Sequence, residues 1–144
     1  MPGPAGDQGY GLRVLPGKRE HDRLGAWLER FGRAWETRDP ELAAALFSKD
    51  GSYRETPFDE PLTGSNEIRA YWSTLPRARE DIRFIYEILA AVEPWGIAHW
   101  RGSYTLVEPE MRVEIDGILL IALDGEGACR EFREWSNRRE SPVR

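Results

Sequence analysis

Cysteine and histidine are scarce in this chain, which has one cysteine and two histidines in 144 residues. A single cysteine, Cys129, excludes a disulfide within the chain and fits a reducing compartment. Zinc sites are built mainly from these two residue types, so His21, His99 and Cys129 argue against a metal centre. We therefore expect neither a metal ion nor a disulfide.

The sequence also lacks long apolar runs and an excess of basic residues. No apolar stretch approaches the roughly 20 residues of a membrane-spanning helix, and the net charge of −5 argues against binding to nucleic-acid phosphates. The first residues have neither the basic start nor the apolar segment of a signal peptide. No phosphate-binding loop or dinucleotide fingerprint is present. These absences predict a cytoplasmic protein with no cofactor, no membrane partner and no nucleic-acid partner.

Glycine and proline gather at the N-terminus, where residues 1–17 contain five glycines and three prolines. This composition is typical of a flexible tail. We predict a tail over residues 1–18, one domain over residues 19–140 and a short C-terminal tail over residues 141–144. A domain of this length can bury a substantial core.

The first half of the domain predicts three helices and one short strand. Apolar side chains at helical spacing indicate a helix over residues 21–38. That apolar stripe consists of Leu24, Trp27, Leu28, Phe31 and Trp35. Asp39 followed by Pro40 is typical of the start of a second helix. A strand is expected over residues 52–56, and Ser65 can cap a third helix. The core-facing residues of the third helix are Ile68, Tyr71, Trp72 and Leu75.

The second half changes to the alternating pattern of strands. Strands are expected over residues 82–89, 98–104, 113–123 and 128–137, with a hairpin turn at residues 124–127. Three helices followed by antiparallel strands indicate the α+β class. Several strands are apolar on both faces, so one face must meet the helices and the other needs its own cover. A homodimer formed through the sheet would supply that cover.

Two sequence patterns resemble the SnoaL-like branch of the nuclear-transport-factor-2-like superfamily. They are the aromatic stretch from Trp27 to Trp72 and the final Phe132-Arg133-Glu134-Trp135. The resemblance covers roughly residues 19–140. It implies a cone-shaped α+β barrel, in which three N-terminal helices pack on a strongly curved, mixed or antiparallel sheet, usually in a dimer. The family includes ketosteroid isomerase, scytalone dehydratase, limonene-epoxide hydrolase, polyketide cyclases and proteins with no known reaction.

The comparison with limonene-epoxide hydrolase implies a polar centre. Tyr53 and Glu55 match the tyrosine and asparagine that position water in that enzyme. Arg101 matches its central arginine, and Glu134 matches its final catalytic aspartate. Ser103 stands where the hydrolase has a further aspartate, so the relay is incomplete and epoxide hydrolysis itself is disfavoured.

The comparison with ketosteroid isomerase is weaker. It aligns the apolar Leu119 with the aspartate of the oxyanion hole. Asp116 lies three residues earlier and could point inward if a β-bulge shifts the register. It could instead lie on the dimer face or cap a neighbouring backbone group.

The residues themselves also indicate acid–base chemistry. Strand alternation places Glu134 on the same face as Phe132. If that face is inward, burial raises the pKa of Glu134 unless a cation is near, and Arg101 on an adjacent strand would be that cation. Glu55 would add a second carboxylate, and the pair would then hold and exchange a proton near neutrality. Tyr53 could donate a hydrogen bond to a substrate oxygen.

These arguments define two sets of candidate residues. The predicted catalytic residues are Glu134, Arg101, Glu55, Tyr53 and Asp116. The predicted substrate-binding residues are Trp27, Phe31, Trp72, Phe132 and His99. Structural roles remain open for all of them, because ion pairs also perturb pKa values and aromatic stripes form cores. His99 could equally be a packed or dimer-face histidine.

Two functions follow from the sequence. The first is a cofactor-independent enzyme that isomerises, cyclises, dehydrates or adds water to a largely apolar small molecule in the pocket of the cone. The alternative is a non-catalytic ligand-binding or dimeric interaction module of the same fold.

Overall fold

The computed structural model describes residues 17–75 and 78–143. The predicted N-terminal tail lies outside the described residues up to residue 16. Helix α2 begins at Lys18, and the last strand includes Ser141 and Pro142, so the ordered elements extend slightly beyond the predicted domain bounds. Among the described residues, no helix is long and apolar enough to cross a membrane.

Three helices form where the sequence predicts them: α2 over Lys18–Thr37, α3 over Pro40–Ala45 and α4 over Gly64–Thr74. Helix α2 ends because Arg38 adopts a left-handed conformation with φ of 55°. The Asp39 carboxylate then accepts the backbone N–H groups of Glu41 and Leu42 at 3.0 and 3.1 Å, which caps α3. The chain thereby turns sharply from α2 into α3.

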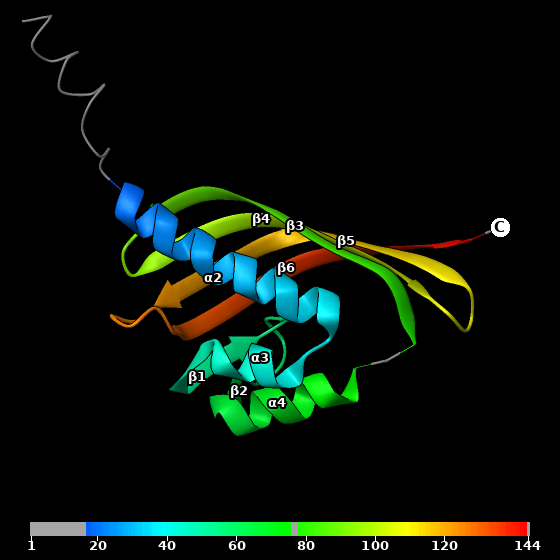
Figure 1. The fold of residues 1–144 in the computed structure, drawn as a ribbon, viewed down its shortest axis with the longest axis horizontal. Coiled ribbons are helices and arrows are strands. Elements are labelled where there is room, and N and C mark those ends of the chain that lie inside the picture. Colours follow the sequence, from blue (N-terminus) through cyan, green and yellow to red (C-terminus); the bar gives the residue numbers. More distant parts are fainter. Residues whose placement is uncertain (1–16, 76–77, 144) are drawn as a thin grey trace, which may run out of the picture.

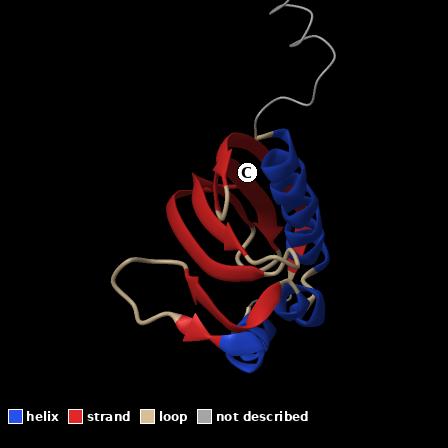
Figure 2. Ribbon diagram, turned by 90° about the vertical axis from the view of Figure 1, so that its left-hand side faces the viewer, coloured by secondary structure: helices blue, strands red, loops and turns tan. Residues whose placement is uncertain are grey.

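Six strands form one sheet in the order β2-β1-β6-β5-β4-β3. The strands are β1 over Phe47–Arg54, β2 over Leu62–Thr63, β3 over Arg79–Val92, β4 over Trp95–Leu106, β5 over Met111–Leu123 and β6 over Cys129–Pro142. All neighbours are antiparallel except β1 and β6, which are parallel, so the sheet is mixed. The expected α+β class and cone are confirmed, with a sheet that curls without closing (Figure 2).

The helices give the sheet two different faces. Helix α2 crosses the face formed by β3 to β6, while α3 and α4 lie together near β1 (Figure 1). We call the face covered by α2 the inner face; its residues include Phe84, Trp100, Leu119 and Phe132. On the opposite, outer face no helix lies among the described residues; this face includes Ile85, Arg101, Asp116 and Trp135.

An aromatic cluster fills the narrow part of the cone. Trp27 stacks on Phe31 with ring centroids 5.1 Å apart, and Phe31 lies 5.3 Å from Phe132. The indole of Trp27 donates to the Leu46 carbonyl at 2.9 Å. All three aromatic side chains are at most 2% exposed. The structure thus places Trp27, Phe31 and Phe132 in the hydrophobic core, and their role in substrate binding stays a prediction.

Candidate functional site

Two carboxyl groups meet at the inner face where β1 runs parallel to β6. The register pairs Tyr53 with Phe132 and Arg54 with Arg133. Continuing it by one residue brings Glu55, just past the end of β1, beside Glu134. The charge of Glu55 is close enough to raise the pKa of Glu134. A parallel pairing between strands far apart in sequence therefore creates the carboxyl pair.

Two tyrosines hold Glu55. The hydroxyl of Tyr53 donates to Oε2 of Glu55, and the hydroxyl of Tyr71 on α4 donates to Oε1. Burial, followed by the nearby Glu55 charge, raises the pKa of both tyrosines, so both hydroxyls keep their protons and remain donors. An ionised carboxylate has only acceptor sites, and two hydroxyl donors match it. Glu55 is therefore oriented as a proton acceptor.

Glu134 has the opposite character. Burial, followed by the negative charge of Glu55, raises the pKa of Glu134 from 4.5 to about 8. The Ser136 hydroxyl donates to Oε2 of Glu134 at 2.9 Å and partly offsets this rise. Near neutral pH Glu134 consequently carries a proton beside an acceptor carboxylate. Such a pair can deliver one proton and remove another.

A cavity of about 420 Å³ opens between the C-terminal ends of α2 and α4. Its lining consists of Trp35, Thr37, Arg38, Asp39, Pro40, Trp72, Ser73, Leu75 and Arg79. This volume lies in the range of small-molecule sites. Of the predicted substrate-binding residues, Trp72 is the one in this lining.

Three buried nitrogen atoms of the described chain lack hydrogen-bond partners: Nε1 of Trp72, Nε1 of Trp100 and Nε of Arg79. Leaving a buried donor unpaired is costly, and native proteins pair almost all of them with protein, water or ligand. Trp72 and Arg79 line the cavity. Trp100 faces inward in a cross-strand row with Gly117 and Ser136, beside Glu134. Two of the unpaired donors thus border the cavity, and the third lies in the row next to Glu134.

The structure separates Arg101 from Glu134. Arg101 pairs with Asp116, which in turn pairs with Asn137, whereas Glu134 pairs with Leu119, and these two rows project to opposite faces. The predicted ion pair between Arg101 and Glu134 therefore does not form, and that prediction is wrong. No register shift occurs over Met111–Ala122, so Asp116 also stays outside.

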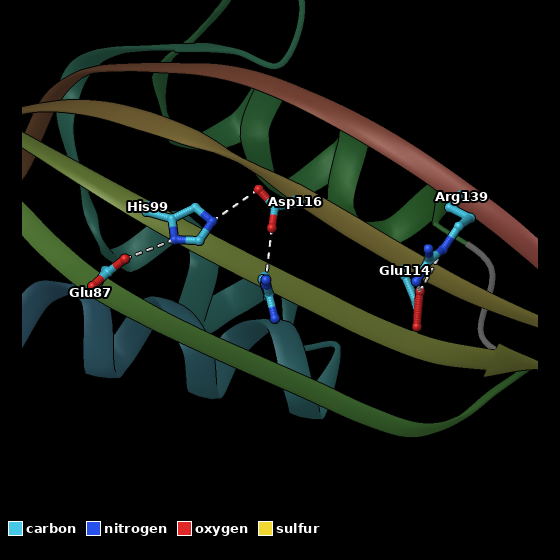
Figure 3. Close-up of polar contacts among 6 residues, drawn as sticks. Glu87, His99, Glu114, Asp116 and Arg139 are labelled. Atoms are coloured by element: carbon cyan, nitrogen blue, oxygen red, sulfur yellow. Dashed lines mark hydrogen bonds and ion pairs between the residues drawn. The ribbon is translucent and has the colours of Figure 1, made fainter.

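Arg101 and Asp116 belong to a charged network on the outer face (Figure 3). Arg101 Nε donates to Asp116 at 2.9 Å, and the ring nitrogens of His99 lie 2.9 Å from Asp116 and 3.1 Å from Glu87. These contacts raise the pKa of His99 and lower that of Asp116. Figure 3 views this network with the helices behind the sheet. His99, Arg101 and Asp116 are thus remote from the inner carboxyl pair.

Sequence reasoning missed two residues of the site. Tyr71 was visible as an apolar-face residue of the third helix, but its hydroxyl contact depends on how α4 packs against β1. Arg79 precedes the predicted strand, and only the register of β3 shows that it faces inward over Tyr104. Among the described residues, no cluster of three or more metal-ligating side chains occurs.

Comparisons with known proteins agree with this architecture. A computationally designed 17-OHP binder is 13% identical, with a TM-score of 0.70 over 83% of this chain and 98% of that chain. Delta 5-3-ketosteroid isomerase from a Mycobacterium species is 14% identical, also with a TM-score of 0.70 and coverages of 83% and 98%. An epoxide hydrolase/cyclase-like enzyme of pyran ring formation in the polyether salinomycin is 17% identical, with a TM-score of 0.68 and coverages of 82% and 92%.

At these identities the structural likeness concerns the fold alone. The comparison with curated proteins gave no match. The sequence model of the SnoaL-like domain, however, matches residues 28–131. That match spans most of the chain and includes α3, α4, β1 and the carboxyl-bearing Glu55. The chain belongs to the SnoaL-like family of the nuclear-transport-factor-2-like superfamily.

Proposed function

We propose that this chain is a cofactor-independent enzyme that transfers protons on an oxygen-bearing small molecule. The observation that carries the proposal is the pair of inner-face carboxyls in unlike surroundings. Glu134 is held protonated by burial and by Glu55, and Glu55 accepts hydrogen bonds from Tyr53 and Tyr71. Acid and base are then ready at the same pH.

The proposed step moves two protons. Glu134 donates its proton to an ether, epoxide, hydroxyl or carbonyl oxygen of the substrate as negative charge develops there. Glu55 removes a proton from the attacking water or hydroxyl group, or from a carbon next to a carbonyl. Glu134 ends ionised and Glu55 protonated, and exchange with solvent or product restores the starting state. Isomerisation, cyclisation, dehydration and water addition all follow this scheme.

The structural neighbours support this class of chemistry. The ketosteroid isomerase and the cyclase-like enzyme share the fold, and their names describe an isomerisation and the formation of a pyran ring. The indole rings of Trp35 and Trp72 line the cavity and suit an apolar substrate body. The ring of Tyr53 stacks on Phe132 with centroids 4.8 Å apart, which fixes the direction of its hydroxyl.

The test is turnover of a panel of epoxides, hydroxy-epoxides and unsaturated ketones, followed by mass spectrometry. We expect Glu134→Gln to lower kcat for any converted compound by about 10²–10⁴-fold. The kcat of the wild type should fall above about pH 8, where Glu134 loses its proton. Glu131→Gln on the same strand serves as the control and should retain kcat. Unchanged turnover in Glu134→Gln would refute the assignment.

A ligand-binding module is the second candidate function. The unpaired indole donors of Trp72 and Trp100 and the designed binder of the same fold favour it. This candidate predicts saturable binding of a small molecule without conversion. It also predicts that wild type and Glu134→Gln both form product no faster than buffer alone, while the two proteins differ in ligand affinity.

A homodimer through the outer face is proposed for the same protein. Large apolar side chains are exposed there, including Ile85 at 60% and Trp135 at 43%. The face also has a groove of about 640 Å³ bordered by Arg101, Asp116 and Arg139. Apolar side chains interspersed with ion pairs are suited to a self-complementary contact, in which each charge meets its opposite on the second copy.

A further inference from the structure

The inner face carries a second polar element, centred on Arg79 at the start of β3. A bulge follows it, because the pairing with β4 shifts between Glu80 and Arg83, and Asp81 has a φ of 50°. Arg112 donates to the Asp81 carbonyl at 3.2 Å and holds the bulge. Arg38 donates to the Arg79 carbonyl at 3.3 Å and ties the end of α2 to the same point. The Arg79 backbone is therefore anchored from two sides.

The side chain of Arg79 is anchored as well. Its guanidinium lies 4.1 Å from the ring centroid of Tyr104, which is a cation–π contact. Arg138 donates to the hydroxyl of the same tyrosine at 3.1 Å. These contacts fix Arg79 from one side only. Its Nε is buried without a hydrogen-bond partner, and the side chain borders the 420 Å³ cavity.

Positive charge dominates this end of the cavity. Burial lowers the pKa of Arg79, and the charges of Arg138 and Arg38 add to that effect. An arginine nevertheless stays protonated in proteins. The carboxylate in the lining, Asp39, already accepts the two N–H groups that cap α3. An anion from outside the chain would compensate the charge of the Arg79 guanidinium at the border of the cavity.

We propose that this cavity binds an oxyanion group of the small molecule, a carboxylate or a phosphate, on the guanidinium of Arg79. Trp72 borders the same cavity, and its indole N–H offers a second donor. The substrate would then be amphipathic, with an acidic end at Arg79 and an apolar body toward Glu134. The inference that the ligand has an acidic end does not depend on the proposed function. Only the statement that this ligand is a substrate rests on it.

Arg79 and the carboxyl pair both act on the same residue, Tyr71. The charges of Arg79 and Glu134 both reach the hydroxyl of Tyr71, in opposite directions. Tyr71 is also the donor to Glu55. A ligand held by its acidic group at Arg79 would therefore present its other end to the proton-transferring residues. Electrostatic repulsion from Glu55 would disfavour the reverse orientation.

The experiment measures binding by tryptophan fluorescence and calorimetry, and it needs no turnover. The probes are cinnamate, its neutral isostere cinnamamide, phenyl phosphate and inorganic phosphate. Because charge-assisted hydrogen bonds are the strong ones, we expect an aryl anion to bind wild type at least about tenfold more tightly than cinnamamide. Arg79→Gln should abolish that preference, whereas Arg79→Lys should keep part of it. Arg130→Gln, an exposed arginine on β6, should leave it unchanged.

The same titrations in Glu134→Gln separate this proposal from the proposed function, because anion preference there does not depend on catalysis. If cinnamate binds more tightly than phenyl phosphate, the acidic group of the ligand is a carboxylate. The reverse order of affinity assigns a phosphate. Equal affinity of anion and amide for wild type overturns the proposal. So does an unchanged preference in a folded Arg79→Gln protein, or the absence of saturable binding of either aryl anion.

Discussion

At the scale of single residues, Glu55 and Glu134 show how surroundings divide two identical side chains. Glu55 lies at the end of β1 with a tyrosine hydroxyl on each oxygen. Glu134 lies on β6, with the Ser136 hydroxyl as its hydrogen-bond donor. Burial, followed by the charge of Glu55, raises the pKa of Glu134 to about 8, so Glu134 retains its proton near neutral pH. This asymmetry is the reason for assigning Glu134 as acid and Glu55 as base.

The pKa of Glu134 predicts a pH dependence of stability. It is about 8 in the folded protein against an ordinary value of 4.5, so between these pH values the folded state binds more protons than the unfolded state. The free energy of unfolding therefore falls as pH rises, and the contribution of Glu134 is complete below about pH 4.5 and lost above about pH 8. Glu134→Gln should remove about 2–4 kcal/mol of this decline.

Urea denaturation of wild type and Glu134→Gln at about pH 5 and about pH 9 measures this effect. Glu131→Gln, which removes a carboxyl from the same strand, is the matched control and should follow wild type. Equal pH dependence in wild type and Glu134→Gln would show that Glu134 titrates normally.

At the scale of elements, glycines in the strands set how closely the layers approach. A Cβ on Gly102 would lie 2.6 Å from the Trp35 ring and 2.7 Å from the Trp100 ring. A Cβ on Gly117 would lie 2.3 Å from the backbone oxygen of Trp135. These positions admit the large indoles at the inner face and let β6 approach β5 beside Ser136. The carboxyl site depends on that close approach.

Gly117→Ala tests this dependence. The added methyl group meets backbone that cannot rotate away, so we expect the free energy of unfolding to drop by about 2 kcal/mol or more. Gly125→Ala in the β5–β6 hairpin is the control, since nothing lies within 4 Å of its added Cβ. That variant should stay within about 0.5 kcal/mol of wild type. Similar urea midpoints for the two variants would contradict the packing argument.

At the scale of the whole molecule, the inner and outer faces of the sheet differ in what covers them and in which polar groups they carry. The inner face is covered by α2 and holds Glu55 and Glu134, the proposed proton-transferring groups. The outer face has no covering element among the described residues and combines exposed apolar side chains with the network of Glu87, His99, Arg101 and Asp116. A second copy is the proposed cover.

Sedimentation measures this association. We expect a dimer for wild type and a monomer for the double variant Ile85→Glu/Trp135→Glu, because two buried unpaired charges per subunit would cost several kcal/mol. Val107→Glu changes an exposed apolar residue that follows β4 and should remain dimeric. A monomeric wild type at micromolar concentration would refute the dimer.

The sequence by itself determined the class of the fold and its local elements. Helical spacing located α2, the Asp39-Pro40 pair located the start of α3, and alternation located the long strands. These signals are local, so a single sequence suffices to recognise them. The same alternation grouped Glu134 with Phe132 and Ser136 correctly, because side chains two residues apart share a face of a strand.

Only the tertiary structure decided which face each strand turns inward and what lies opposite. Strand alternation leaves two choices per strand, and a strand apolar on both faces does not distinguish them. Arg101 was therefore assigned to the wrong side of the sheet. Tyr71 and Arg79 joined the site through the packing of α4 on β1 and the bulge in β3. Such long-range contacts leave no periodic signal in the sequence, and they are what turns two glutamates into a candidate acid–base pair.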